Sequence, residues 1–142
     1  MKGGQGKGAV MGAAENKELI QKVFTEMSQG NAKPLLAILG KDICWTVIGT
    51  TKLSGTFRGK QEIYNRLLKP LGSQLQSNIK ITVKSLMADG DQVVLEGYGE
   101  ALTKEGKTYN NTYCWVLKLA EGKVTEMTEY LDTELVIKTF GR

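Results

Sequence analysis

The alternation of apolar and polar residues between positions 107 and 133 predicts two antiparallel strands joined by a tight turn. In the first strand every second residue shares one face, and that face is apolar or aromatic apart from one asparagine. It contains Tyr109, Asn111, Tyr113, Trp115, Leu117 and Leu119. Gly122 lies in the reversal, where a hairpin turn requires a positive φ. We therefore expect the first strand to face a core.

The second strand of this hairpin runs from Val124 to Asp132 and places a carboxylate on an apolar face. Glu129 lies between Met127 and Leu131 at the same two-residue spacing. Removal from water raises the pKa of a carboxylic acid toward the range in which it can transfer protons near neutral pH. Glu129 is therefore a candidate acid or base.

Helical spacing appears earlier in the chain, in three segments. The first begins near residue 15, the second covers about residues 32–39, and the third covers about residues 60–69, where Pro70 is expected to end it. The apolar positions of the first helix are Leu19, Ile20, Val23, Phe24 and Met27.

Strand-like alternation is found in three further segments, at residues 42–48, 78–88 and 92–102. Helices that precede a run of hairpin-connected strands are typical of an α+β fold. We expect three N-terminal helices packed on a strongly curved antiparallel sheet, which together form a cone with an internal pocket.

The chain of 142 residues is long enough for one domain with a substantial core. Residues 1–14 are rich in glycine and nearly free of apolar mass, and we interpret them as a flexible leader or a cloning remnant. Residues 15–142 are expected to form the single domain.

Charge and hydropathy exclude two classes of partner. The net charge is +4, and the basic residues are scattered rather than grouped with aromatic ones, so we expect no nucleic-acid partner. No apolar run approaches the roughly 20 residues that span a bilayer. We therefore expect no membrane association and a cytoplasmic location.

The chain contains no histidine, which is the commonest general base and metal ligand. We expect neither a metal nor a cofactor, and any acid–base chemistry must use other side chains. Cys44 and Cys114 each precede a tryptophan without a second soft ligand nearby, and we interpret them as buried thiols.

Three segments resemble one protein family in the same order. They are TTKLSGTFRG at residues 50–59, YNNTY at 109–113 and GKVTEMTEYLDT at 122–133. Together with the order of elements, they resemble the SnoaL-like polyketide cyclase branch of the nuclear-transport-factor-like (ketosteroid isomerase-like) superfamily, over roughly residues 15–141. The resemblance implies the cone fold but not one reaction, since this fold hosts isomerases, cyclases, hydrolases and non-catalytic binders.

The resemblance implies a pocket acid in the EYLD segment, where Glu129 and Asp132 compete for the role. We favour Glu129, because Asp132 would turn inward only if the strand carried a bulge. The epoxide-hydrolase pattern of the superfamily needs an arginine and an aspartate on the preceding long strand. Gly97 and Gly99 occupy those positions here, so that chemistry is not supported.

Six further residues are candidates for substrate binding. Asn111 and Tyr113 could donate hydrogen bonds to a carbonyl or enolate oxygen. The others are Trp45, Tyr64, Met127 and Leu131. A tryptophan such as Trp45 is more often a core residue than a ligand platform, and helix packing explains Tyr64 equally well.

These observations favour a cofactor-independent isomerase, cyclase or hydrolase that acts on a small, apolar or polycyclic carbonyl compound by carboxylate acid–base catalysis. The alternative is a non-catalytic domain of the same fold that binds a small ligand or another protein. We also expect a homodimer formed through the outer face of the sheet, because Cys114 and Val116 keep that face apolar opposite Trp115 and Leu117.

Overall fold

A six-stranded curved sheet is the centre of the computed structural model, which describes residues 11–142. The strands are β1 Leu39–Val47, β2 Gly55–Arg58, β3 Lys80–Asp89, β4 Gln92–Glu100, β5 Thr112–Ala120 and β6 Lys123–Leu131. Their order across the sheet is β2-β1-β6-β5-β4-β3. All neighbours are antiparallel except β1 and β6, which run parallel, so the expectation of a purely antiparallel sheet needs that one correction.

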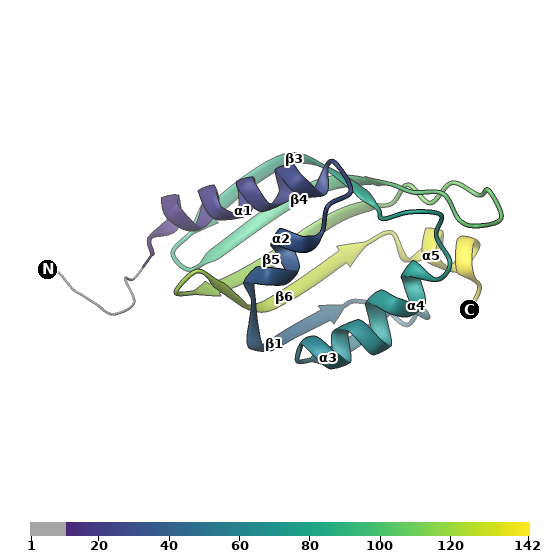
Figure 1. Cartoon of the computed structure of the whole chain (residues 1–142), viewed down its shortest axis with the longest axis horizontal. Coiled ribbons are helices and arrows are strands. Elements are labelled where there is room, and N and C mark those ends of the chain that lie inside the picture. Colours follow the sequence, from purple (N-terminus) through teal and green to yellow (C-terminus); the bar gives the residue numbers. More distant parts are fainter. Residues whose placement is uncertain (1–10) are drawn as a thin grey trace, which may run out of the picture.

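The helices lie mainly over one face of this sheet (Figure 1). They are α1 Ala13–Met27, α2 Lys33–Ile38, α3 Lys60–Ile63, the π-helical turn η1 Tyr64–Leu68, α4 Lys69–Gly72 and α5 Thr133–Phe140. The first helix begins at Ala13, so only the first ten residues of the expected leader lie outside the described part of the chain.

The third predicted helix is longer than the sequence pattern indicated. It continues past Pro70 to Gly72 as the successive segments α3, η1 and α4. Pro70 lies in the first turn of α4, directly after the π-helical turn, where a residue without an N–H group is tolerated. The extension adds Leu71 to Leu67 and Leu68 over the inner face of the sheet, where all three line the cavity described below.

The core lies between the helices and the inner face of the sheet. Strands β4 and β5 alternate strictly between buried and more exposed residues, as the period of two requires. Helix α1 buries Ile20, Val23 and Phe24 against this face, and the Phe24 ring centroid lies 5.5 Å from that of Trp115. The predicted α+β cone, with helices on one face of a curved sheet, is confirmed.

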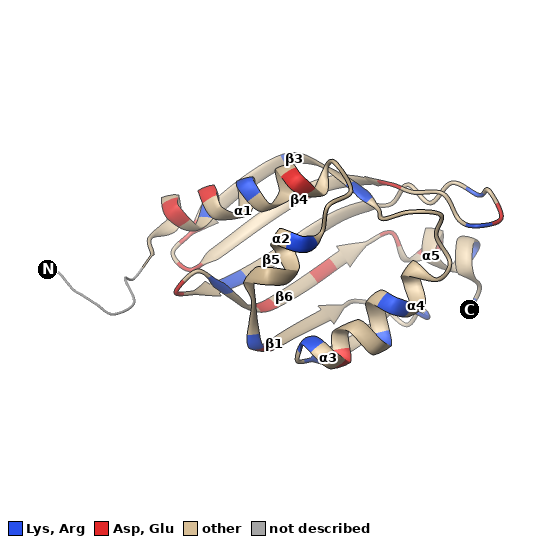
Figure 2. Cartoon of the chain, viewed as in Figure 1, with Lys and Arg blue, Asp and Glu red and all other residues tan. Residues whose placement is uncertain are grey.

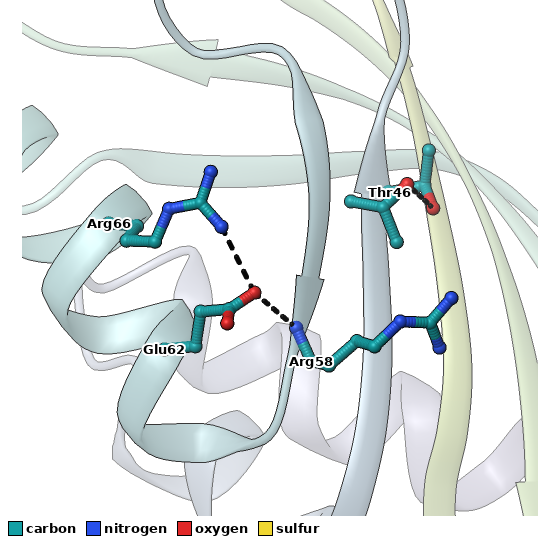
Figure 3. Close-up of polar contacts among 5 residues, drawn as sticks. Thr46, Arg58, Glu62 and Arg66 are labelled. Carbon is teal, nitrogen blue, oxygen red and sulfur yellow. Dashed lines mark hydrogen bonds and ion pairs between the residues drawn. The ribbon is translucent and has the colours of Figure 1, made fainter.

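Short polar contacts attach the edge strand β2 to its neighbours (Figure 3). Glu62 Oε2 accepts hydrogen bonds from the backbone N of Arg58 at 2.9 Å and from Arg66 Nη1 at 3.2 Å. The Arg66 guanidinium lies 5.1 Å from the centre of the Phe57 ring. On the other side of β2, the hydroxyls of Thr46 and Thr56 are 3.1 Å apart. These contacts hold the four-residue strand β2 in place at the edge of the sheet.

Charged residues of both signs are interspersed along the helices and strands (Figure 2). Within residues 11–142, no helix is both long enough and apolar enough to cross a membrane.

Candidate functional site

A cavity of about 120 Å³ lies between the inner face of the sheet and the helices. We call it the inner chamber. Its walls are almost entirely apolar, and the polar groups that reach it are one carboxylate, two tyrosine hydroxyls and two indole N–H groups. The lining residues are Phe24, Met27, Leu35, Trp45, Leu53, Leu67, Leu68, Leu71, Ile79, Ile81, Tyr109, Tyr113, Trp115, Met127 and Glu129.

The carboxylate of the inner chamber belongs to Glu129 on β6. Its neighbour across the antiparallel pair is Trp115 on β5, and the parallel strand β1 brings Trp45 to its other side. Both indoles donate to the same oxygen: Trp115 Nε1 lies 3.0 Å from Oε1, and Trp45 Nε1 lies 3.3 Å from it. Among residues 11–142, no group forms a hydrogen bond with Oε2. One oxygen is thus fixed by the protein while the other is available to a ligand.

The apolar surroundings of Glu129 change its ionisation. Burial raises the pKa of the Glu129 carboxyl above its usual range, and the hydrogen bonds from Trp115 and Trp45 offset only part of this rise because they favour the ionised form. No ion pair among the described residues involves Glu129. A carboxyl in this environment can hold or release a proton closer to neutral pH than an exposed glutamate can.

Tyr113 and Tyr109 add two hydroxyl groups to the same chamber. Burial raises the pKa of Tyr113 well above its ordinary value, and neighbouring Tyr109 and Glu129 raise it further. Burial also raises the pKa of Tyr109, although the hydrogen bond from Asn111 opposes the rise. Both phenols therefore stay protonated and can donate hydrogen bonds at physiological pH.

The position of the Tyr113 ring depends on its neighbours on two strands. The ring is stacked on Trp115, with centroids 4.5 Å apart and planes 13° from parallel. On β4, a Cβ atom at Gly99 would lie 2.7 Å from Tyr113 Cε2. Gly99 therefore provides the space that this tyrosine occupies, which gives the glycine a packing role at a position where the epoxide-hydrolase pattern needs a polar side chain.

Asn111 is buried but does not line the inner chamber. Its Nδ2 donates to the Tyr109 hydroxyl at 3.1 Å and to the Asp132 carbonyl at 3.1 Å, and its Oδ1 accepts from the Asp132 backbone N at 2.9 Å. All the polar atoms of its side chain are thus occupied by the protein. Asn111 joins the segment before β5 to the end of β6 and holds the Tyr109 hydroxyl in place.

Asp132, the second candidate acid, lies outside the chamber. It is exposed, and its Oδ1 accepts a hydrogen bond from the Leu135 backbone N at 3.1 Å, as the N-cap of α5. The irregularity in the pairing of β5 and β6 lies between Lys118 and Leu119, far from the position that would turn Asp132 inward. Leu131 pairs with Tyr113 across the sheet and also lies outside the chamber lining.

The remaining predicted residues divide between two neighbouring spaces. Trp45 and Met127 line the inner chamber, whereas Tyr64 lines a second space of about 490 Å³, which we call the outer hollow. The two spaces have six lining residues in common, so they lie side by side. These are Met27, Leu35, Trp45, Leu68, Leu71 and Ile79.

Sequence reasoning gave Trp115 no functional role, although it forms the shorter hydrogen bond to Glu129. Its spacing of two residues from Tyr113 placed it on the inner face, and the pairing of β5 with β6 places it directly opposite Glu129. The paired register of a hairpin was the signal that could have identified this contact.

Other reactive groups lie away from this site. Cys44 and Cys114 are half-buried, each in sequence next to an inward-facing tryptophan, and burial together with nearby Glu96 raises the pKa of the Cys114 thiol. In the part of the chain that the structure describes, no three His, Cys, Asp or Glu side chains come close enough together to hold a metal ion.

Comparison with known proteins identifies similar chains. The model of the SnoaL-like domain family matches residues 20–127. An uncharacterized protein of Mycobacterium tuberculosis is 20% identical over 123 residues, which cover 87% of this chain and 93% of that protein. The crystal structure of an NTF2-like protein of unknown function from Burkholderia pseudomallei superposes with a TM-score of 0.76 at 16% identity, covering 89% of this chain and 98% of that one. The structure of TerC co-crystallized with polyporic acid superposes with a TM-score of 0.73 at 23% identity, covering 87% of this chain and 96% of that one.

Proposed function

Because this chain belongs to the SnoaL-like domain family, we propose that it is a cofactor-independent enzyme in which Glu129 transfers a proton to or from a small, mostly apolar carbonyl compound. The observation that carries the proposal is the environment of the Glu129 carboxyl and the hydrogen bonds that it accepts. It is the only acid in an apolar chamber, one of its oxygens is held by two indoles, and the other has no partner among residues 11–142.

The chemistry requires a base, a hydrogen-bond donor to the enolate oxygen, and a group that gives the proton back to the substrate. Ionised Glu129 Oε2 takes a proton from the carbon next to the substrate carbonyl. The electron pair of the broken C–H bond forms a C=C bond, and the π pair of the carbonyl moves to its oxygen. The Tyr113 hydroxyl donates a hydrogen bond to the enolate oxygen that forms. Where the substrate carries a C=C bond conjugated with this enolate, return of the proton from Glu129 to the far carbon of that bond completes an isomerisation. If the enolate carbon instead attacks a second carbonyl, the proton goes to the new alkoxide and a ring closes.

The size and polarity of the site support this substrate class. An apolar cavity of about 150 Å³ accommodates a benzene ring, so the inner chamber suits one ring or a group of similar size. The TerC structure was obtained with polyporic acid, which supports a small-molecule ligand for this fold. Asn111 takes a positioning role in this proposal, because its side-chain polar atoms are bound within the protein. Asp132 takes a structural role, because it is exposed outside the chamber and its Oδ1 caps α5.

The experiment that tests the proposal begins with a binding screen. The chain has two tryptophans, Trp45 and Trp115, and both line the inner chamber, so a ligand that enters should change the intrinsic fluorescence. Carbonyl compounds that change it are then assayed for turnover.

Glu129→Gln should lower turnover by about 10²-fold or more, the usual contribution of a positioned base, while the fold is kept because a glutamine oxygen can still accept from the two indoles. Glu126→Gln, an exposed position on the same strand, is the matched control and should leave turnover unchanged. Equal turnover of wild type and Glu129→Gln would refute the assignment. Tight binding without turnover by the wild type would favour the non-catalytic ligand-binding domain.

Two further features belong to this proposal. We propose that the enzyme is a homodimer formed through the outer face of the sheet and that it is located in the cytoplasm. The cytoplasmic location is tested by fractionation of cells that express the tagged full chain.

A further inference from the structure

The outer hollow is larger than the inner chamber and lies next to it. Its volume is about 490 Å³ against about 120 Å³, and the two share lining residues on α1, α2, β1, η1 and α4. Ligand sites in proteins typically enclose about 300–1,000 Å³. The inner chamber alone lies below this range, so a ligand of ordinary size whose carbonyl reaches Glu129 needs further room, and the adjacent outer hollow offers it.

Lys33 gives the outer hollow its charge. It is the only charged side chain that lines this space in the described part of the chain. Lys33 is exposed, and no ion pair within residues 11–142 includes it. Its ammonium group is therefore available to a ligand at the open end of the site.

The neutral donors of the outer hollow are partly engaged within the protein. Asn31 Nδ2 donates to Glu26 Oε1 at 3.0 Å, and Asn78 Nδ2 donates to the Gly30 carbonyl at 3.0 Å. Gln76 Nε2 donates to the Thr103 carbonyl, also at 3.0 Å. Among the described lining residues Lys33 supplies the one charged donor, which favours an anionic ligand group over a neutral one.

We propose that the ligand is elongated, with its carbonyl end at Glu129 and an anionic group, such as a carboxylate, bound by Lys33. The inference rests on the proposed function, because it takes Glu129 as the group that meets the carbonyl. It adds a substrate class: an apolar body that carries a carbonyl at one end and a negative charge at the other.

The test uses a series of ω-oxo-ω-phenylalkanoic acids of increasing chain length and their primary amides, which have nearly the same size and shape as the acids but carry no charge. Binding is measured by quenching of the intrinsic tryptophan fluorescence at low salt. We expect the best acid to bind the wild type about threefold more tightly than its amide, the range of one partly exposed charge pair. The preference should disappear in Lys33→Gln and reverse in Lys33→Glu.

The matched control is Lys17→Glu, which makes the same charge change on α1 at an exposed position that lines neither space. It should keep most of the preference for the acid. An unchanged preference in Lys33→Glu overturns the inference, and so does a wild type that shows no preference at any chain length or binds none of the acids.

Failure of this inference can be told from failure of the proposed function. Loss of turnover in Glu129→Gln together with no effect of Lys33 removes the anion subsite and keeps the enzyme. A clear effect of Lys33 on binding together with full turnover in Glu129→Gln keeps the elongated anionic ligand and removes Glu129 as the base.

Discussion

At the scale of single residues, the two oxygens of Glu129 have different surroundings. Oε1 accepts two N–H groups, so a proton on the neutral carboxyl is placed on Oε2, which has no partner among residues 11–142. The same oxygen is the free acceptor when the group is ionised. One atom therefore donates or accepts depending on protonation, which is what a group that takes a proton and later returns it requires.

The raised pKa of Glu129 predicts a pH dependence of stability. Below the pKa of an ordinary glutamate, about 4.3, both the folded and the unfolded chain hold this proton. As the pH rises, the unfolded chain releases the proton first, so the contribution of Glu129 to the free energy of unfolding falls until the pH passes the raised pKa of the folded state. The difference in free energy of unfolding, wild type minus Glu129→Gln, should therefore decrease across this window. Urea denaturation at a series of pH values measures it.

The control for this experiment is Glu126→Gln, which should track the wild type across the same pH range, because its carboxylate is exposed. A wild-type minus Glu129→Gln difference that is flat with pH, or that increases, would show that burial does not raise the pKa of Glu129.

Replacing either Trp115 or Trp45 by phenylalanine should raise the pKa of Glu129 further above its usual range. The hydrogen bond from Trp115 favours the ionised form, so Trp115→Phe should raise the pKa of Glu129 above its wild-type value. The remaining Trp45 contacts the same carboxyl and should report the titration through its emission. Trp45→Phe should cause a smaller rise, because its hydrogen bond is longer, 3.3 Å against 3.0 Å. A lower pKa in either variant would contradict this account.

At the scale of the elements, the end of β6 is held by Asn111 and then becomes the start of α5. Asn111→Ala leaves the Tyr109 hydroxyl and two backbone groups of Asp132 without their partner, so we expect a loss of about 2–4 kcal/mol in the free energy of unfolding. Asp132→Ala removes only a helix cap and should cost about 1 kcal/mol.

Asp132→Asn is the matched control, because asparagine caps a helix about as well as aspartate. Chemical denaturation checks the order of the three variants. If Asp132→Asn lost turnover while its stability was unchanged, the catalytic role would move from Glu129 to Asp132.

The elements differ in how well the sequence predicts them. The alternation from Tyr113 to Leu119 correctly predicts the inner face of β5, because a period of two is a local property of the chain. Tyr109 and Asn111 lie before β5, which begins at Thr112, so the predicted strand starts too early. The contact of Trp45 with Glu129 depends on the parallel pairing of β1 with β6, and those residues are 84 positions apart. Local spacing carries no information about such a pairing. Local spacing does not determine the role of Asp132 either, because that role depends on the helix that starts at Thr133 and that Asp132 caps.

At the scale of the whole molecule, the two faces of the sheet have different coverings. Helices cover the inner face, whereas the outer face has no covering element within residues 11–142 (Figure 1). A row of apolar and threonine side chains crosses this outer face, since adjacent strands pair Met87 with Val94, Val94 with Val116, Val116 with Thr128 and Thr128 with Thr46. Tyr98 and Tyr130, on the same face, are each 45% exposed. A continuous row of this kind is a candidate interface.

The homodimer proposal predicts that a charge at the centre of this row separates the subunits. Val116 is half-buried at the middle of the outer face, so Val116→Lys would place like charges together across a two-fold interface. Light scattering at micromolar concentration should give twice the chain mass for the wild type and the chain mass for Val116→Lys. Gln61→Lys adds the same charge at an exposed position on α3 and should remain dimeric.

Because the row faces away from the inner chamber, isolated Val116→Lys subunits should still show the tryptophan titration of Glu129. A wild type that is monomeric across this range would refute the interface, and a monomer that has also lost the titration would show that the chamber depends on the partner subunit.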